Sequence, residues 1–452
     1  MQLFDSLVGN FNGKIIRDPG DMQQFLTDWR GKWTGVAIAV IQPERTEDVA
    51  LAVRWCHEHH ISVVPQGGNT GLSGGATPNN SGQNIVLSLS RMKQIRGIDV
   101  VNNTISLDAG VTLQAVQEAA DAAGKLFPLS LAAEGTCTIG GNLATNAGGV
   151  QVLRYGNARD LCLGLEVVTA DGRIWNGMKS LRKDNTGYDL KNIFIGSEGT
   201  LGVITGATLK LFEKPKSKVV AFIAISDPSS AIRLLKLAQK MHSNELTAFE
   251  LMSDECISLV EKHVDAARLP LADRSEWYVL LELSSSSDEQ ALSARIENLL
   301  EAAMEAELIT DAAISSSISQ FNAIWSLRED ISEAQAAEGK TIKHDISLPI
   351  STIAVFIDQM TKQLLDKFSN IRMVVFGHLG DGNLHFNISP AKNLVSSQIQ
   401  LFTEIEAEVN KLVHDSVNDF NGSISAEHGL GVLRRDEASR YRSETERSLM
   451  EI

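Results

Sequence analysis

Apolar residues in the first half of the chain follow two alternating patterns. Short runs rich in β-branched residues have the composition of strands, while longer segments with apolar positions three and four apart are typical of amphipathic helices. The strand-like runs are VAIAVI (36–41), ISVVP (61–65), NIVLSLS (84–90), TISLDAG (104–110) and LGLEVVTADG (163–172), and the helical segments are 47–60 and 112–124.

The pattern changes after the charged segment EKPKSK at 213–218, and residues 207–338 contain no glycine. Strand-like VVAFIAIS (219–226) and WYVLLELS (277–284) alternate with helical 229–242 and 288–305. This order predicts an antiparallel sheet with helices on one face, an α+β arrangement. We therefore expect an N-terminal helical segment (1–35), a glycine-rich domain (36–213), a second domain (214–410) and a C-terminal segment (411–452).

Composition and charge narrow the classes of partner. The chain has 452 residues, 43% of them hydrophobic and 21% charged, and a formal net charge of -15. Such a charge opposes binding to nucleic acids and anionic membranes. The longest apolar runs are too short to span a bilayer, and MQLFDSLVGNFNGK resembles neither a secretory signal nor an Arg-rich presequence, so we expect a cytoplasmic protein.

Four cysteines, Cys56, Cys137, Cys162 and Cys256, form no CxxC pair. That spacing fits reduced thiols serving as small core residues.

Two loops concentrate glycine with Asn, Ser and Thr: PQGGNTGLSGG (65–75) and GTCTIGGNLATNAGG (135–149). A backbone of this composition can approach a ligand closely and offer N–H groups to phosphate, although either loop alone could be a tight turn. The sequence contains no GxGxxG and no GxxxxGK[ST], which argues against a Rossmann NAD site and a P-loop.

The segment GHLGDGNLH (377–385) predicts two strands joined by a turn at Asp381-Gly382, with His378 and His385 near its mouth. Two imidazoles so placed are either ordinary polar residues or half of a tetrahedral zinc site. Glu427 is the best available third ligand, since His2Glu sets leave one position open to substrate.

Three further residues are candidates for substrate chemistry. Arg328 and Lys343 could hold an anionic substrate, although surface charges are the simpler interpretation from composition alone. His428 could be a general base or a partner that orients Glu427. For both neighbours to serve one site, they must lie on a turn or at a helix start, which Gly429 and Gly431 permit.

Several of these motifs, taken in order, resemble those of the vanillyl-alcohol-oxidase-type flavoproteins, most of all the branch of D-2-hydroxyglutarate and D-lactate dehydrogenases. They are PQGGNTGLSGG, GGNLATNAGG, RYG (154–156), LRKDNTGYDLKNIFIGSEGTLGVIT (181–205), GHLGDGNLH and SAEHGLG (425–431). The resemblance implies an α+β fold: a two-subdomain FAD-binding domain and an antiparallel-sheet substrate (cap) domain with covering helices.

The resemblance also implies which residues hold FAD. The pyrophosphate would be wrapped by Pro65, Gln66, Gly67, Gly68, Asn69, Thr70, Gly71 and Leu72. The ribityl chain and isoalloxazine would be lined by Thr138, Gly141, Asn142, Thr145 and Asn146, and the adenosine end by Glu198, Gly199, Gly202 and Ile204. The first loop has no histidine, so we expect noncovalent FAD; His57, His59 and His60 fit the exposed end of a helix.

For the active site, the resemblance implies a metal held by His378, His385 and Glu427, with Zn²⁺ first and manganese or cobalt as alternatives. His428 would be the general base. Arg328, Ser332, Lys343 and Asn387 would bind substrate.

The implied reaction is oxidation of a D-2-hydroxy acid to a 2-oxo acid, with hydride transfer to FAD. D-2-hydroxyglutarate ranks first and D-malate second; D-lactate or glycolate is the alternative. With no nicotinamide site visible, electrons would pass to an electron-transfer flavoprotein, a quinone or a cytochrome. A homodimer, a zinc hydrolase and a catalytically silent flavin-binding subunit also stay open. Relatives continue into an Asp-Pro and Asn-Pro-Gly segment, whereas this sequence ends at SLMEI, which puts flavin retention in question.

Overall fold

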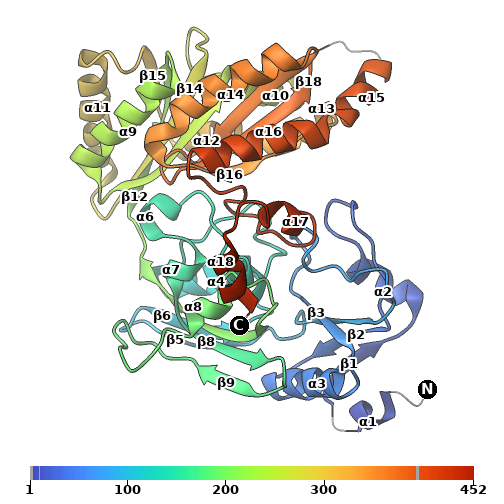
Figure 1. The fold of residues 1–452 in the computed structure, drawn as a ribbon. Coiled ribbons are helices and arrows are strands. Elements are labelled where there is room, and N and C mark those ends of the chain that lie inside the picture. Colours follow the sequence, from blue (N-terminus) through green and yellow to red (C-terminus); the bar gives the residue numbers. More distant parts are fainter. Residues whose placement is uncertain (1–3, 10, 393–395, 452) are drawn as a thin grey trace. The chain divides into compact units, whose positions relative to one another are not determined.

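The structure, a computed structural model, describes residues 4–9, 11–392 and 396–451. The chain forms two compact units (Figure 1). The first unit, here the flavin unit, contains residues 1–149, 155–214 and 427–452; the second, here the substrate unit, contains 150–154 and 215–426. Each unit is therefore assembled from separate stretches of sequence.

The flavin unit contains two main sheets. The first has the order β1 (Gly13–Ile16), β2 (Ala39–Pro43), β4 (Asn84–Ser88), β3 (Ser62–Gln66). The second has the order β5 (Ile95–Asp99), β6 (Thr104–Asp108), β10 (Gly202–Lys210), β8 (Cys162–Thr169), β9 (Ile174–Gly177) and is antiparallel throughout. A short ladder joins β7 (Lys125–Leu126) to β11 (Phe212–Glu213). The five strand-like runs of the first half are all confirmed as strands.

Helices of the flavin unit pack on these sheets. Both predicted helices are confirmed, as α3 (Thr46–Glu58) and α4 (Leu113–Ala122). The Thr112 side chain caps α4 by accepting a hydrogen bond from the Ala115 amide at 3.3 Å. The other helices are short: α1 (Asp5–Val8), α2 (Pro19–Leu26), α5 (Ile139–Ala144), α7 (Ala158–Leu161), α8 (Lys191–Phe194), α17 (Arg435–Ala438), α18 (Glu444–Glu451) and, at the crossover between units, α6 (Val152–Tyr155).

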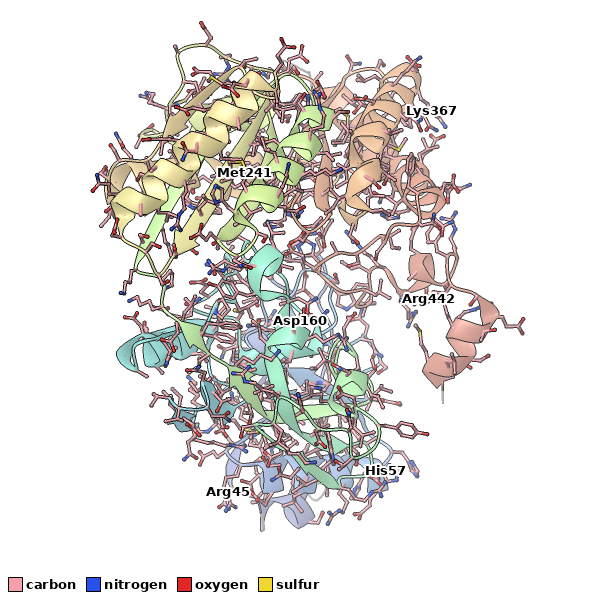
Figure 2. The ribbon with its side chains drawn as sticks, turned by 90° about the vertical axis from the view of Figure 1, so that its left-hand side faces the viewer. Arg45, His57, Asp160, Met241, Lys367 and Arg442 are labelled. Carbon is pink, nitrogen blue, oxygen red and sulfur yellow. The ribbon has the colours of Figure 1, made fainter. Side chains whose placement is uncertain are left out.

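Two predictions for this unit have definite outcomes. His57, His59 and His60 are exposed at the C-terminal end of α3, as expected (His57 is labelled in Figure 2). The N-terminal segment, however, is not only helical: the run GKII forms β1, which pairs antiparallel with β2. Its two β-branched isoleucines suit a strand, and Ile16 buries its side chain.

The substrate unit is built on one seven-stranded antiparallel sheet. Its order is β15 (Asp311–Ile314), β12 (Ser217–Ile225), β14 (Trp277–Ser285), β13 (Leu246–Ser253), β17 (Ile371–Gly377), β18 (Asn383–Pro390), β16 (Asp345–Ser347). The helices are α9 (Pro228–His242), α10 (Asp254–His263), α11 (Glu289–Glu305), α12 (Ile318–Glu329), α13 (Ile331–Glu338), α14 (Ile353–Lys367), α15 (Ser396–Glu404) and α16 (Glu406–Asp419), with a 3₁₀ turn η2 (Ile350–Thr352).

Helices cover both faces of this sheet, so the expectation of helices on one face is wrong. Residues of α10, α12 and α13 share a buried cluster with alternate residues of β12, β13 and β14. Helix α9 contacts all three of these strands, α11 contacts β12 and β14, and α9 also contacts α14 (Figure 1). Met241 on α9 and Lys367 on α14 mark this helical layer in Figure 2. The physical reason is that these strands are apolar on both sides, and each side must be covered.

Burial of the cysteines agrees with the sequence prediction. All four are buried and none forms a disulfide. Burial raises the pKa of Cys56, Cys162 and Cys256 to about 12. Among the described residues, no helix combines the length and apolarity needed to cross a bilayer.

These thiols should be inert in the folded protein. At pH 8, a thiol with a pKa near 12 is a thiolate in roughly one molecule in ten thousand, and the thiolate is the reacting form. A disulfide reagent such as DTNB should therefore label Cys56, Cys162 and Cys256 only after guanidinium denaturation, when all four cysteines react. Rapid labelling of two or more thiols in the native protein would contradict this prediction.

Candidate active site

The two glycine-rich loops pack directly against each other within the flavin unit. A Cβ atom on Gly68 would lie 1.9 Å from the Thr136 carbonyl oxygen, and one on Gly67 would lie 2.3 Å from the Thr138 Oγ1. Both contacts are shorter than any side chain tolerates. Glycine is thus required at Gly68 because two backbones share one space, and at Gly67 because the Thr138 side chain occupies the position of a Cβ.

Left-handed backbone conformations mark the same loops and also Glu198, which follows them in the sequence. Asn69 and Asn146 have φ values of +53° and +51°, and Glu198 has +52°, in the left-handed region that non-glycine residues rarely adopt. All three are among the predicted FAD residues. Such conformations persist where surrounding structure imposes them and gather at ligand sites.

The polar groups of the loops divide into structural ones and one suited to a ligand. Gln66 is structural, since its amide donates to the carbonyls of Phe25 (3.0 Å) and Ala76 (2.8 Å). The Thr138 Oγ1, by contrast, is buried without a hydrogen-bond partner among the described residues. A buried hydroxyl costs free energy unless it is paired. The loops therefore fit a group such as FAD, which would bring oxygen atoms to main-chain amides and to this hydroxyl.

Glu198 also serves a purpose that the sequence did not reveal. Its carboxylate accepts hydrogen bonds from the amides of Leu430 (2.7 Å) and Gly431 (2.8 Å). From the first glycine-rich loop, the Ser73 hydroxyl shares its one proton between the carbonyls of His428 and Gly429, both at 3.2 Å. Two charge-assisted hydrogen bonds to Glu198 and one shared hydrogen bond from Ser73 thus hold the segment that carries His428.

Glu427 and His428 lie on a bend, as two neighbours that serve one site must. Gly429 and Gly431 follow with φ values of +72° and +51°. Within the flavin unit, the Glu427 Oε1 accepts a hydrogen bond of 2.6 Å from the Gly149 amide, at the end of the second glycine-rich loop. The carboxylate is therefore oriented by the loop that precedes the chain's first crossing between units.

In the substrate unit, Arg328 and His378 meet at a carboxylate that no sequence motif indicated. Glu250, on β13, is 1% exposed. The Arg328 Nε donates to its Oε2 at 2.8 Å, and the His378 Nδ1 lies 2.9 Å from its Oε1. Burial by itself raises the pKa of Glu250, but its electrostatic and hydrogen-bond contacts with His378 and Arg328 outweigh this effect and lower the pKa overall.

His378 and His385 come together as predicted, although not by a two-residue turn. Strands β17 and β18 are joined by residues 378–382, and His385 pairs with Phe376 in the ladder. The two imidazole rings are 5.7 Å apart between centroids, at 75° to one another. Asp345, another residue missed in the sequence, places its Oδ1 3.8 Å from the His385 Nδ1.

The peptide before Glu427 is tied to this group of residues. The Ala426 amide donates to the Asp345 carbonyl at 3.2 Å, inside the substrate unit. The three predicted metal ligands divide between the units, with His378 and His385 in one and Glu427 in the other. Imidazole nitrogen and carboxylate oxygen are both common ligands of Zn²⁺, so these three residue types fit a metal site. That the three residues bind one metal ion together stays a prediction.

The remaining predicted substrate residues have different surroundings. Asn387 is buried, and its amide is engaged at both ends: Oδ1 accepts from the His344 amide and Nδ2 donates to the Gln335 Oε1, each at 3.0 Å. Lys343 is half-buried just before β16, whereas Ser332 is exposed on α13. Their roles stay predictions.

Comparisons with known proteins match both units. A family model for an FAD binding domain covers residues 37–177, and a model for the C-terminal domain of FAD linked oxidases covers residues 214–451. D-2-hydroxyglutarate dehydrogenase of Danio rerio is 39% identical over 428 residues, which are 94% of this chain and 77% of that protein. The dehydrogenase of the same name from Xanthomonas citri pv. viticola is 37% identical over 437 residues, 97% of this chain and 90% of the relative.

Solved structures agree on the fold. The structure of p-cresol methylhydroxylase with bound substrate has a TM-score of 0.74 at 15% identity and covers 99% of this chain and 92% of that one. Alkyldihydroxyacetonephosphate synthase has a TM-score of 0.71 at 16% identity, with coverage of 94% and 80%. At such low identity, the likeness concerns the fold alone.

Close-packed glycine-rich loops in a two-sheet unit, followed by a unit with a seven-stranded sheet, define an FAD-dependent oxidoreductase. The chain belongs to the FAD-linked oxidase family. The flavoprotein resemblance predicted from the sequence and the predicted fold class are both confirmed.

Gly68 allows a direct test of the loop packing. Replacing Gly68 with Ala should force Thr136 to move, open the surface between the two loops and reduce FAD retention at least tenfold, measured as flavin absorbance per protein after gel filtration. Gly97→Ala is the matched control, because a Cβ at Gly97 would contact nothing within 4 Å. Full flavin content in the Gly68→Ala protein would show that the loops do not need this close approach.

Proposed function

We propose that the protein oxidises a D-2-hydroxy acid to the corresponding 2-oxo acid. The observation that carries the proposal is the meeting of Arg328, His378 and His385 at one end of the substrate sheet, in a chain whose other unit binds FAD. A carboxylate-binding cation beside two metal-type ligands suits a substrate with a carboxylate and a hydroxyl on neighbouring carbons. Relatives named D-2-hydroxyglutarate dehydrogenase support this substrate class.

The chain's residues take the following roles. His428 removes the proton of the substrate hydroxyl, the general-base role that imidazole most often takes in catalysis. Arg328 orients the substrate carboxylate through its guanidinium, and the Ser332 hydroxyl and the second N–H of the Asn387 amide donate further hydrogen bonds. His378, His385 and Glu427 would hold a divalent metal, Zn²⁺ first. When bound, FAD supplies the hydride acceptor and the metal supplies Lewis acidity toward the hydroxyl oxygen.

For the particular acid, we propose D-2-hydroxyglutarate first and D-malate second. Lys343 adds a second cation, which a second carboxylate can use as a point charge. D-lactate and glycolate have one carboxylate and do not require a second cation. They form the alternative, and a Schizosaccharomyces pombe protein assigned to the D-lactate dehydrogenases, 37% identical over 453 residues, supports it.

Further parts of the proposal concern the surroundings of the enzyme. Electrons leave the flavin to an electron-transfer flavoprotein, a quinone or a cytochrome. The enzyme works in the cytoplasm and forms a homodimer. Its chain divides into the four segments expected from the sequence, 1–35, 36–213, 214–410 and 411–452. Several relatives are mitochondrial by name, and the name of the Xanthomonas citri relative gives no compartment.

Anaerobic flavin bleaching tests the reaction. The purified protein should be yellow, and its flavin absorbance should bleach with D-2-hydroxyglutarate but not with the L isomer. Chelation should slow the bleaching and added Zn²⁺ should restore it. Colourless protein with metal-dependent hydrolase activity would favour a zinc hydrolase. Yellow protein that no D-2-hydroxy acid bleaches, with metal present, would favour a silent flavin-binding subunit.

Lys343→Met tests the identity of the acid. Loss of the cation should raise the KM for D-2-hydroxyglutarate about tenfold or more, and leave the KM for D-lactate within about twofold, because one charged contact contributes about 1.5–3 kcal/mol. Lys340→Met is the matched control, since Lys340 is exposed and bonds to Thr403 at 3.0 Å. Unchanged turnover of D-2-hydroxyglutarate in Lys343→Met would rule out the second-carboxylate role.

A further inference from the structure

We infer that Glu250 is a positioning residue that fixes the substrate-binding arginine and one metal-binding histidine with a single buried carboxylate. The inference rests on the proposed function and adds a residue that the proposed reaction does not itself require. All of its geometry lies inside the substrate unit, on strand β13, helix α12 and the loop after β17.

The contact with His378 sets the chemical form of the imidazole. An ionised carboxylate only accepts hydrogen bonds, so the His378 Nδ1, 2.9 Å from the carboxylate oxygens, is the protonated ring nitrogen. Nε2 then carries the in-plane lone pair with which histidine binds a metal. Carboxylates that orient metal-binding histidines in this way raise metal affinity about 10- to 100-fold.

The contact with Arg328 leaves the other end of the guanidinium for substrate. Glu250 accepts from Nε at 2.8 Å, and the ring of Phe376 lies 4.8 Å from the guanidinium carbon. The guanidinium is thus stacked on one side and bonded to Glu250 through Nε, which leaves its two terminal nitrogens to other partners. One of them lies 3.4 Å from the His378 Nε2. The nitrogen proposed to bind the metal and the cation proposed to bind the carboxylate are thus neighbours.

A second carboxylate provides the comparison that separates positioning from mere burial. Glu282 on β14 is opposite Ala248 in the ladder, and Ala248 is two residues before Glu250, so both glutamates point to the same face of the sheet. Glu282 is also buried, at 4% exposure, but accepts from the Trp325 indole at 2.9 Å. Glu282 is therefore bonded to Trp325, whereas Glu250 is bonded to Arg328 and His378. Glu282 has no role in the proposed chemistry.

Glu250→Gln is the informative change, because glutamine keeps the size and one acceptor oxygen. The oxygen can still accept from Arg328, but the amide group then donates to the His378 Nδ1 and moves the ring proton to Nε2. We expect a loss of Zn²⁺ affinity of about 10- to 100-fold, measured on the FAD-loaded protein by competition with a chromophoric chelator, and a higher KM for D-2-hydroxyglutarate. Glu250→Asp retains the acceptor carboxylate and should recover part of the affinity.

Glu282→Gln is the matched control for Glu250→Gln. Glu282→Gln should match the wild type in Zn²⁺ affinity and KM, while FAD content and melting temperature should be similar in the two Gln variants. An equal loss of Zn²⁺ affinity in both, or none in Glu250→Gln, would overturn the inference while the wild type remains active. If the wild type binds no Zn²⁺ and oxidises no 2-hydroxy acid, the proposed function fails first, and the inference with it.

Discussion

The close backbone approach between the two glycine-rich loops is the constraint on which the flavin unit depends. Gly68 lies so near Thr136 that no side chain fits between them, and the same loops hold the C-terminal segment through Ser73 and Gly149. The surface that fits FAD and the bend that carries Glu427 and His428 are therefore parts of one assembly. A shift in either loop changes both.

Most of the fold could be predicted from local patterns, because strands and amphipathic helices differ in apolar period. The exceptions have a physical cause. The run VVAFIAIS is apolar at nearly every position, which identifies a strand but does not reveal how many helices cover it, and α10, α12 and α13 on the second face were missed. The short run GKII forms β1 by pairing with the edge of β2, a partner that the local pattern does not reveal.

The site was predictable where residues close in sequence are also close in space, as for His378 and His385. Glu250 was not, because it lies in LTAFELMS, an otherwise apolar strand, and 78 residues separate it from Arg328. Its importance arises from tertiary contacts that no local spacing records. The same holds for Ser73, 355 residues before His428, and for Asp345, which is paired with His385 across two neighbouring strands. In each case the residue type can be read from the sequence, but the residue that it contacts in the fold cannot.

The chain passes between the two units after Gly149, Arg154, Lys214 and Ala426, and this path limits how the protein can be dissected. A fragment ending at Lys214 would contain both glycine-rich loops. It would lack the C-terminal segment whose backbone amides donate hydrogen bonds to the Glu198 carboxylate. The complementary fragment would carry that segment without its binding surface. A minimal flavin-binding fragment therefore has to join the last stretch of the sequence, from Glu427 onward, directly to the part that ends at Lys214.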